Sequence, residues 1–186
     1  METHSIVKEY SLGETFLNKA ERIITKSDIK FIYDRQTSRG EITDPNVIDK
    51  GQIIHHLYYD HKPQSEHYQF FKSVFDETQI PVKQMLRMKI NITFPLIDYR
   101  EHNHQMCHQD INNPEQRPEL KFRSLIVYIN DSDGDTMFFE NNKIIKRINH
   151  KRGKAILFDS SLTHAGQNPM KHDSRIVLNT IFVAGD

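Results

Sequence analysis

The chain has 186 residues and a mass of 22.0 kDa, which is enough for one domain with a hydrophobic core. Its 25 basic and 25 acidic residues give no net charge, so the composition argues against a nucleic-acid partner. No apolar run approaches the roughly 20 residues that cross a bilayer, the N-terminus has no signal-peptide pattern, and the lone cysteine cannot form an internal disulfide, so we expect a cytoplasmic protein without a membrane partner.

The first 80 residues are predicted to form a helical support region within one domain that spans residues 1–186. From Gly13 to the Ser27-Asp28 pair, apolar residues recur at helical spacing, and a short strand is expected at residues 29–33. A second amphipathic helix is predicted after Ser65, which would cap its N-terminus. Between them, residues 34–64 contain Gly and Pro breakers without a regular period, so we expect a loop that packs on the core or faces the substrate.

From about residue 84 the hydrophobic period changes from 3.6 to 2. In residues 86–94 apolar side chains alternate with polar ones, which predicts a long strand whose polar face looks either into a cavity or into solvent. Further strands are predicted at residues 122–130, 136–139, 143–148, 154–159 and 175–183. Helices followed by many short strands without helices between them predict a mainly β protein, with a jelly-roll core at residues 84–184 buttressed by the N-terminal helices.

A candidate metal centre lies in this strand-rich part. Three of the chain's 11 histidines lie in residues 102–108, and Asp110 follows the last of them by two positions. An imidazole and a carboxylate at i and i+2 of an extended segment point to the same side, so His108 and Asp110 can bind one metal ion. A histidine on another strand, for which His164 is the candidate, would complete the two histidines and one carboxylate of non-heme Fe(II) oxygenases. We interpret Cys107 as a small filler residue.

Arg175 follows His164 by eleven residues. We expect the intervening turn to make the strands of His164 and Arg175 antiparallel neighbours. A guanidinium there could bind a distal carboxylate in a two-pronged salt bridge.

These residues resemble the pattern of the Fe(II)- and 2-oxoglutarate-dependent dioxygenases, and within them the prolyl-4-hydroxylase-like group. The family pattern is a histidine, any residue and an aspartate, then a distant histidine, with an arginine or lysine about ten residues later. The resemblance covers about residues 84–184, and its matching blocks are His108-Gln-Asp110, His164 with Arg175, Tyr128-Ile-Asn130, Asp133-Gly-Asp-Thr136 and Gly153 to His164.

The resemblance implies that His108, Asp110 and His164 bind Fe(II) and carry catalysis, while Arg175 binds the far carboxylate of 2-oxoglutarate. It implies a double-stranded β-helix and a hydroxylase that consumes O2 and 2-oxoglutarate and releases succinate and CO2, with ascorbate as a candidate addition. The implied substrate is a peptidyl residue, prolyl among the candidates, or a small metabolite.

Four further residues are candidates for the co-substrate site. Tyr128 matches a family tyrosine whose hydroxyl shares the carboxylate, and Tyr99 lies near one that lines the co-substrate pocket. Asn179 shares a strand face with Arg175, and Asn91 lies on the polar face of the long early strand. Ordinary structural roles, a core tyrosine for Tyr128 and a solvated strand position for Asn91, remain open alternatives.

Two other functions compete with this interpretation. A cupin-type metal-dependent protein could use His102 and His104 with His108 or Glu101 and no keto acid. A jelly-roll module could bind its ligand without catalysis. Nucleic-acid demethylation is disfavoured, because that branch of the oxygenases carries a second arginine a few residues after the first, and none follows Arg175 in its strand.

Overall fold

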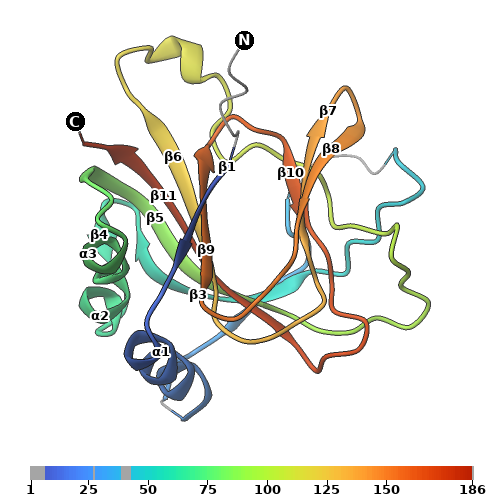
Figure 1. The fold of residues 1–186 in the computed structure, drawn as a ribbon, viewed down its shortest axis with the longest axis horizontal. Coiled ribbons are helices and arrows are strands. Elements are labelled where there is room, and N and C mark those ends of the chain that lie inside the picture. The colour runs from blue at the N-terminus through green and yellow to red at the C-terminus, as the bar shows by residue number, and fades with distance from the viewer. Residues whose placement is uncertain (1–6, 27, 39–42, 186) are drawn as a thin grey trace.

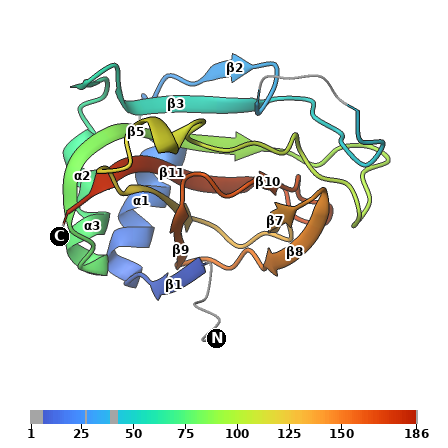
Figure 2. The same ribbon diagram turned by 90° about the horizontal axis from the view of Figure 1, so that it is seen from above.

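The computed structural model describes residues 7–26, 28–38 and 43–185, which form two antiparallel sheets that face each other in a jelly roll (Figure 1). The larger sheet runs in the order β1-β9-β6-β11-β5-β3-β2 with β4 paired to β3, and the smaller runs β10-β7-β8. The strands of the larger sheet are β1 (Val7–Ser11), β2 (Ile32–Asp34), β3 (Gln52–Tyr59), β4 (Lys62–Pro63), β5 (Val82–Thr93), β6 (Phe122–Tyr128), β9 (Lys154–Asp159) and β11 (Arg175–Ala184). The strands of the smaller sheet are β7 (Thr136–Glu140), β8 (Lys143–Ile148) and β10 (His164–Gly166). The predicted mainly β jelly-roll fold is confirmed. Figure 2 shows the larger sheet edge to edge, from β2 to β1.

Helices cover the side of the larger sheet that faces away from the smaller one (Figure 1). They are α1 (Glu14–Lys26), α2 (Tyr68–Lys72) and α3 (Val74–Thr78), and a 3-10 turn, η1 (Pro114–Gln116), lies in the loop before β6. The predicted apolar face of α1 is buried, as Phe16, Leu17, Ala20, Ile23 and Ile24 all pack into the main core. Ser27, where this helix was predicted to end, lies outside the described residues.

The long strand β5 divides the helix-packed core from the interior of the jelly roll. Met88, Ile90 and Ile92 are buried against the helices. The alternate side chains, Lys89 and Asn91 among them, line the cavity between the sheets. The polar face of β5 therefore looks into a cavity and not into solvent, which decides between the two alternatives that its sequence leaves open.

The predicted loop at residues 34–64 is wrong, because β2, β3 and β4 lie in it or overlap its start. The strand β3 pairs with β2 on one edge and with β5 on the other, and a register shift between His56 and Tyr58 interrupts its alternation. Its apolar and polar residues also come in adjacent pairs, as in Ile53-Ile54 and His55-His56, so the sequence shows no clean period of two, which explains the error. The strand β1, which pairs with β9, was also missed.

The predicted second helix is broken into α2 and α3 at Ser73, whose hydroxyl donates to the Phe70 carbonyl. Ser65 does not cap it, since His67 occupies the N-cap of α2 and makes no side-chain cap bond. A hydroxyl that bonds its own backbone competes with helix continuation, and this accounts for the break.

The expected pairing of the strands of His164 and Arg175 is wrong as well. β10 pairs with β7 in the smaller sheet, while β11 pairs with β5 and β6 in the larger one. Residues 167–174 connect the two sheets, and His164 and Arg175 line the same cavity from different sheets instead of lying on one ladder.

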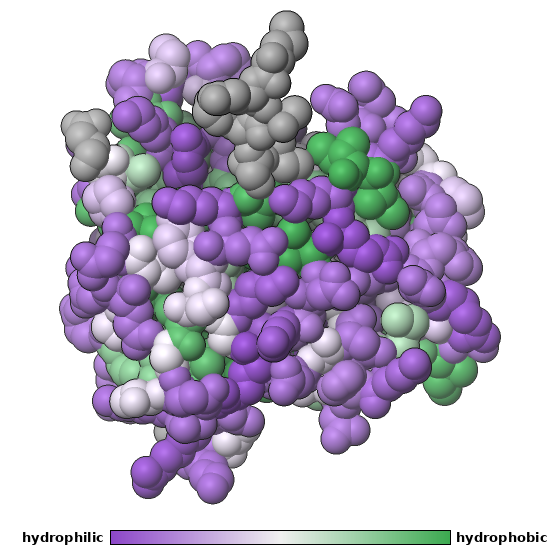
Figure 3. Space-filling view, viewed as in Figure 1, coloured by the Kyte–Doolittle hydropathy of each residue, from purple (hydrophilic) through white to green (hydrophobic). Residues whose placement is uncertain are grey.

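No helix in the described part of the chain is long and apolar enough to span a membrane. The face drawn in Figure 3 is mainly hydrophilic, with separate apolar spots.

Candidate metal centre

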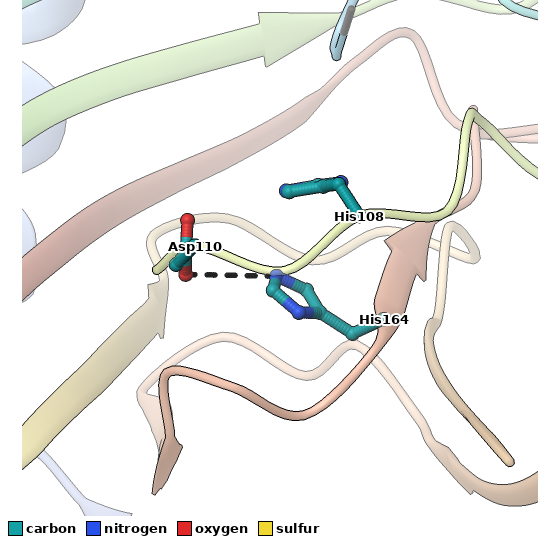
Figure 4. Close-up of side chains that lie close together, drawn as sticks. All are labelled: His108, Asp110 and His164. Carbon is teal, nitrogen blue, oxygen red and sulfur yellow. Dashed lines mark ion pairs between the residues drawn. The ribbon is translucent and has the colours of Figure 1, made fainter. Parts of the chain in front are cut away.

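His108, Asp110 and His164 come together in the interior of the jelly roll (Figure 4). One donor atom from each side chain lies within 4.8 Å of the other two. The segment of His108 and the strand β10 hold each other by reciprocal backbone hydrogen bonds, from His108 N to His164 O and from His164 N to His108 O, each 2.9 Å. The distant parts of the sequence are thus joined directly at the site.

Hydrogen bonds orient both imidazoles. His108 Nδ1 lies 3.2 Å from the Met106 carbonyl, and His164 Nδ1 lies 2.9 Å from the Leu162 carbonyl. Because a carbonyl only accepts, each Nδ1 carries the proton and each Nε2 keeps its lone pair. The Nε2 of His164 points at Asp110, whose Oδ2 lies 3.7 Å away. This is how metal-ligating histidines are held in proteins.

The carboxylate of Asp110 is fully buried and is held on both oxygens. Arg87 Nη2 donates to Oδ1 at 3.0 Å, and the Ser124 hydroxyl donates to Oδ2 at 2.7 Å. Burial alone would raise the pKa of Asp110, but its interactions with His164, Arg87 and His108 and the hydrogen bond from Ser124 outweigh burial and keep that pKa below its usual value. The group is therefore a carboxylate at neutral pH.

His108, in contrast to the ionised Asp110, is uncharged at neutral pH. Burial, reinforced by the neighbouring His164, lowers the pKa of His108 to about 4, so this imidazole is neutral at pH 7. A neutral imidazole and an ionised carboxylate are the forms that ligate a divalent metal. The donor set of two imidazole nitrogens and one carboxylate is the facial triad of non-heme iron sites and leaves coordination positions for other ligands, so the residues fit a ferrous ion.

A cavity of about 380 Å³ opens beside these three residues, and Arg175 lies in its wall with 5% of its surface exposed. Its Nε donates to the Gly134 carbonyl at 2.7 Å and its Nη2 donates to the Thr136 hydroxyl at 3.1 Å. Two glycines let the chain approach Arg175 closely: a Cβ at Gly134 would clash, at 2.6 Å from the Gln167 carbonyl oxygen and 2.7 Å from Arg175 Cδ, and one at Gly166 would be a tight 3.2 Å from Nη1. The guanidinium is thus held rigidly with donors to spare.

The other candidate residues fall into two groups. Asn91 and Asn179 line the cavity, as their strand faces predict. Tyr99 and Tyr128 are not among the residues that line it. The Tyr128 hydroxyl donates to Thr136 Oγ1 at 2.8 Å and its ring lies beneath the Arg175 guanidinium, so its role in binding the co-substrate carboxylate stays a prediction. Thr136 lies between the Tyr128 hydroxyl and the cavity, so Thr136 and not Tyr128 lines the cavity beside Arg175.

Tyr99 is buried, and its hydroxyl accepts the backbone N–H of Asn168 at 3.2 Å. It supports the connection between the sheets near Arg175, whose charge lies close enough to affect the Tyr99 pKa. Burial raises that pKa to about 12, so the phenol stays neutral.

Sequence reasoning missed the two partners of Asp110. Arg87 lies on the polar face of β5, two positions from Lys89, so the alternation of that strand could have identified it as a cavity residue. Ser124 offers no such signal, because it lies in a strand that is buried throughout its second half. Its importance follows only from the way β6 passes Asp110.

Lys89 is a further cation in this cavity, besides the arginines in its wall. Only 8% of its surface is exposed, and burial, reinforced by the charge of Arg87, lowers its pKa to about 8. It therefore remains largely protonated at neutral pH.

His102 and His104, the basis of the competing metal site, do not join a metal-binding group among the described residues. His102 is exposed, and His104 is buried with its Nε2 3.6 Å from an Asp44 carboxylate oxygen and its Nδ1 beside the Gln105 carbonyl. Cys107 lies 3.7 Å from His104, and burial raises the pKa of its thiol to about 11, which disfavours the thiolate that a metal would require.

Comparison with known proteins agrees with this geometry. The model of the 2OG-Fe(II) oxygenase superfamily matches residues 94–183, the part of the chain that carries all three metal-ligand candidates and Arg175. No curated protein matches the sequence significantly.

Three solved structures illustrate the fold. An oxidoreductase of the 2OG-Fe(II) oxygenase family from Burkholderia pseudomallei is 10% identical, with 97% of this chain and 86% of that chain covered and a TM-score of 0.68. A prolyl-4-hydroxylase from Pseudomonas putida is 12% identical, with 97% and 94% covered and a TM-score of 0.58. A prolyl hydroxylase from Trichoplax adhaerens, in complex with a hypoxia inducible factor peptide fragment, is 12% identical, with 97% and 84% covered and a TM-score of 0.60. At these identities the likeness shows a shared fold.

Proposed function

We propose that this chain is a member of the 2OG-Fe(II) oxygenase superfamily, whose model matches residues 94–183, and that it hydroxylates a polar small molecule or a peptide residue, with release of succinate and CO2. The family uses Fe(II), 2-oxoglutarate and O2, and the chain is a 2-oxoglutarate-dependent dioxygenase. The proposal concerns the type of reaction, the residues that carry it and the class of substrate.

The observation that carries the proposal is the preorganised donor set beside a buried cation. The Nε2 atoms of His108 and His164 can bind one metal ion, since their Nδ1 atoms are hydrogen-bonded to backbone carbonyls, and each Asp110 oxygen keeps a lone pair beyond the hydrogen bond that it accepts. Iron bound there would activate dioxygen for insertion into a substrate C–H bond while 2-oxoglutarate is oxidised to succinate and CO2.

The protein's own contribution is binding and orientation. Arg175 would bind the far carboxylate of 2-oxoglutarate through the guanidinium N–H groups that Gly134 and Thr136 leave free. Because the guanidinium is buried, a ligand without that carboxylate would leave it unpaired at a cost of several kcal/mol. This selects a diacid of the right length.

The substrate would enter the remainder of the cavity. Its described lining is mainly polar, with Ile126 and Val177 as apolar exceptions. This composition favours a polar substrate. The peptide complex of the Trichoplax prolyl hydroxylase supports keeping a peptide residue, prolyl included, among the candidates.

The experiment is to incubate the iron-loaded protein with 2-oxoglutarate and a cell extract, and to measure succinate together with products that have gained one oxygen. His108→Ala, Asp110→Ala and His164→Ala should each abolish turnover, whereas the control His61→Ala, an exposed histidine in the β3–β4 turn, should not. Iron and 2-oxoglutarate binding without any succinate formation would contradict the proposal and favour a jelly-roll binding module.

A further inference from the structure

Lys89 is an unpaired cation inside the candidate active-site cavity. The side chain extends from the middle of β5 into the cavity, and 8% of the residue's surface is exposed. In the described part of the chain, no hydrogen bond or ion pair involves its ammonium group, although Asp34 and Asp110 lie near enough to affect its charge. Because the side chain lines the cavity at a largely buried position, a ligand that enters the cavity and pairs with the ammonium would gain a charge-assisted hydrogen bond.

The groups around Lys89 are mainly unused donors. Gln52 Nε2 and Arg87 Nε are both buried without a hydrogen-bond partner. Asn91 Nδ2 already donates to Gln52 Oε1, and Asn179 accepts from Arg87. One acceptor, Asn91 Oδ1, is also buried without a partner. An ammonium and two N–H groups against one such acceptor form an excess of donors, which matches an oxyanion better than a cation or a neutral apolar group.

Lys89 lies at a different level of the cavity from Arg175. Lys89 pairs in register with Asn179, which is four residues along β11 from Arg175. At about 3.3 Å per residue, the two strand positions are roughly 13 Å apart. A carboxylate bound by Arg175 therefore leaves Lys89 facing the part of the cavity that remains for the substrate.

The charge balance of the cavity leads to the same conclusion. The described lining contains four cationic side chains, Arg35, Arg87, Lys89 and Arg175, and two carboxylates, Asp34 and Asp110. A ferrous ion and the 2-oxoglutarate dianion have equal and opposite charges. With both bound, the excess of two positive charges is still available to the substrate.

We propose that Lys89 determines substrate specificity by binding a carboxylate of the substrate, so that the enzyme acts on acidic molecules or acidic side chains. The inference rests on the proposed function, because it assumes that 2-oxoglutarate occupies the Arg175 end of the cavity. Lys89 forms the charged contact, and the Gln52 amide supplies a further donor from β3. The hydroxylated carbon then lies at a fixed distance from the substrate's carboxylate.

The test measures binding without turnover. The protein is loaded with zinc, which has no redox chemistry, and saturated with 2-oxoglutarate. Calorimetry then measures the affinity of the protein for two sets of probes. The first set pairs short-chain carboxylic acids with their neutral primary amides. The second pairs terminally blocked peptides that contain aspartate or glutamate with the same peptides carrying asparagine or glutamine. The first set detects a small-molecule acid and the second an acidic residue of a peptide.

Lys89→Met keeps the apolar stem and removes the charge, and Lys89→Arg restores it. We expect at least one acid to bind the wild type while its amide does not, and Lys89→Met to weaken that binding about tenfold to a hundredfold, as loss of a charge-assisted hydrogen bond does. Lys89→Arg should recover most of the affinity. Lys83→Met, which removes an exposed lysine of the same strand, should have no effect.

The inference is overturned if no acid binds, if acids and amides bind alike, or if Lys89→Met binds acids as well as the wild type. It is also overturned if Lys89→Met weakens 2-oxoglutarate binding, since Lys89 would then serve the co-substrate. A wild-type protein that binds neither zinc nor 2-oxoglutarate would instead contradict the proposed function. Circular dichroism of each variant verifies that it is folded.

Discussion

The role of Arg175 leads to a quantitative prediction for 2-oxoglutarate affinity. Two of the five guanidinium N–H groups are used by Gly134 and Thr136, so three remain for a ligand. A two-pronged contact with a carboxylate comprises two charge-assisted hydrogen bonds, each worth about 1.5–3 kcal/mol. Removing both in Arg175→Met should therefore weaken 2-oxoglutarate binding by about 3–6 kcal/mol, or roughly a hundredfold to ten-thousandfold.

Calorimetric titration of the zinc-loaded protein with 2-oxoglutarate measures this effect. Arg175→Lys should lie between the wild type and Arg175→Met, because an ammonium keeps the charge but not the fork of donors. Arg123→Met is the control, since that guanidinium pairs with Asp159 instead of lining the cavity. The metal affinity should stay within about twofold throughout, because in the described part of the chain Arg175 makes no hydrogen bond or ion pair with a metal-ligand candidate. The reasoning is refuted if 2-oxoglutarate affinity is unchanged, or if metal binding is lost with it in a folded protein.

Three further predictions concern other parts of the site. Replacing both His102 and His104 by alanine should leave iron affinity within about twofold, as measured by titration, and its loss would favour the competing cupin-type centre. Arg87→Met should weaken metal binding about 10- to 100-fold, because it releases the Asp110 oxygen that Arg87 holds at 3.0 Å; an unchanged affinity would mean that this contact does not position the ligand. Burial, reinforced by the charge of Arg175, lowers the pKa of His150 to about 3. As the pH falls below about 6.5, this histidine is protonated in the unfolded chain but not in the folded one, so the folded state loses about 2 kcal/mol of unfolding free energy between pH 7 and pH 5. Urea unfolding of the metal-free protein should show that the unfolding free energy of His150→Gln depends less on pH by that amount, and an equal dependence would contradict the assignment.

The predictable part of the fold was the part with a single period. The helix α1 buries one face, and the strand β5 has an apolar face toward the helices and a polar face toward the cavity, so their apolar residues recur at 3.6 and 2 positions and the sequence identifies them directly. The strand β3 has adjacent pairs of apolar and polar residues and a register shift, so its pattern resembles that of a loop. The break at Ser73 depends on a local side-chain bond, which periodicity does not report.

The site follows a similar division. The spacing of His108 and Asp110, with His164 and Arg175 downstream, indicates which side chains to bring together, and the structure places them around one cavity; their role as ligands remains a prediction. The surroundings of these residues could not be derived in this way. Which hydroxyl faces the cavity, Thr136 or Tyr128, depends on how two sheets meet, and the contact of Ser124 with Asp110 joins segments that no pattern in the sequence links.

The central claim is that one iron ion binds His108, Asp110 and His164. Anomalous diffraction at the iron absorption edge, from crystals prepared without oxygen in the presence of Fe(II) and 2-oxoglutarate, tests it most directly. We predict one anomalous peak between the Nε2 atoms of the two histidines and the Asp110 carboxylate, with the keto acid extending from it toward Arg175. A peak at His102 or His104, or no peak at the three residues in protein that retains iron, would contradict this account.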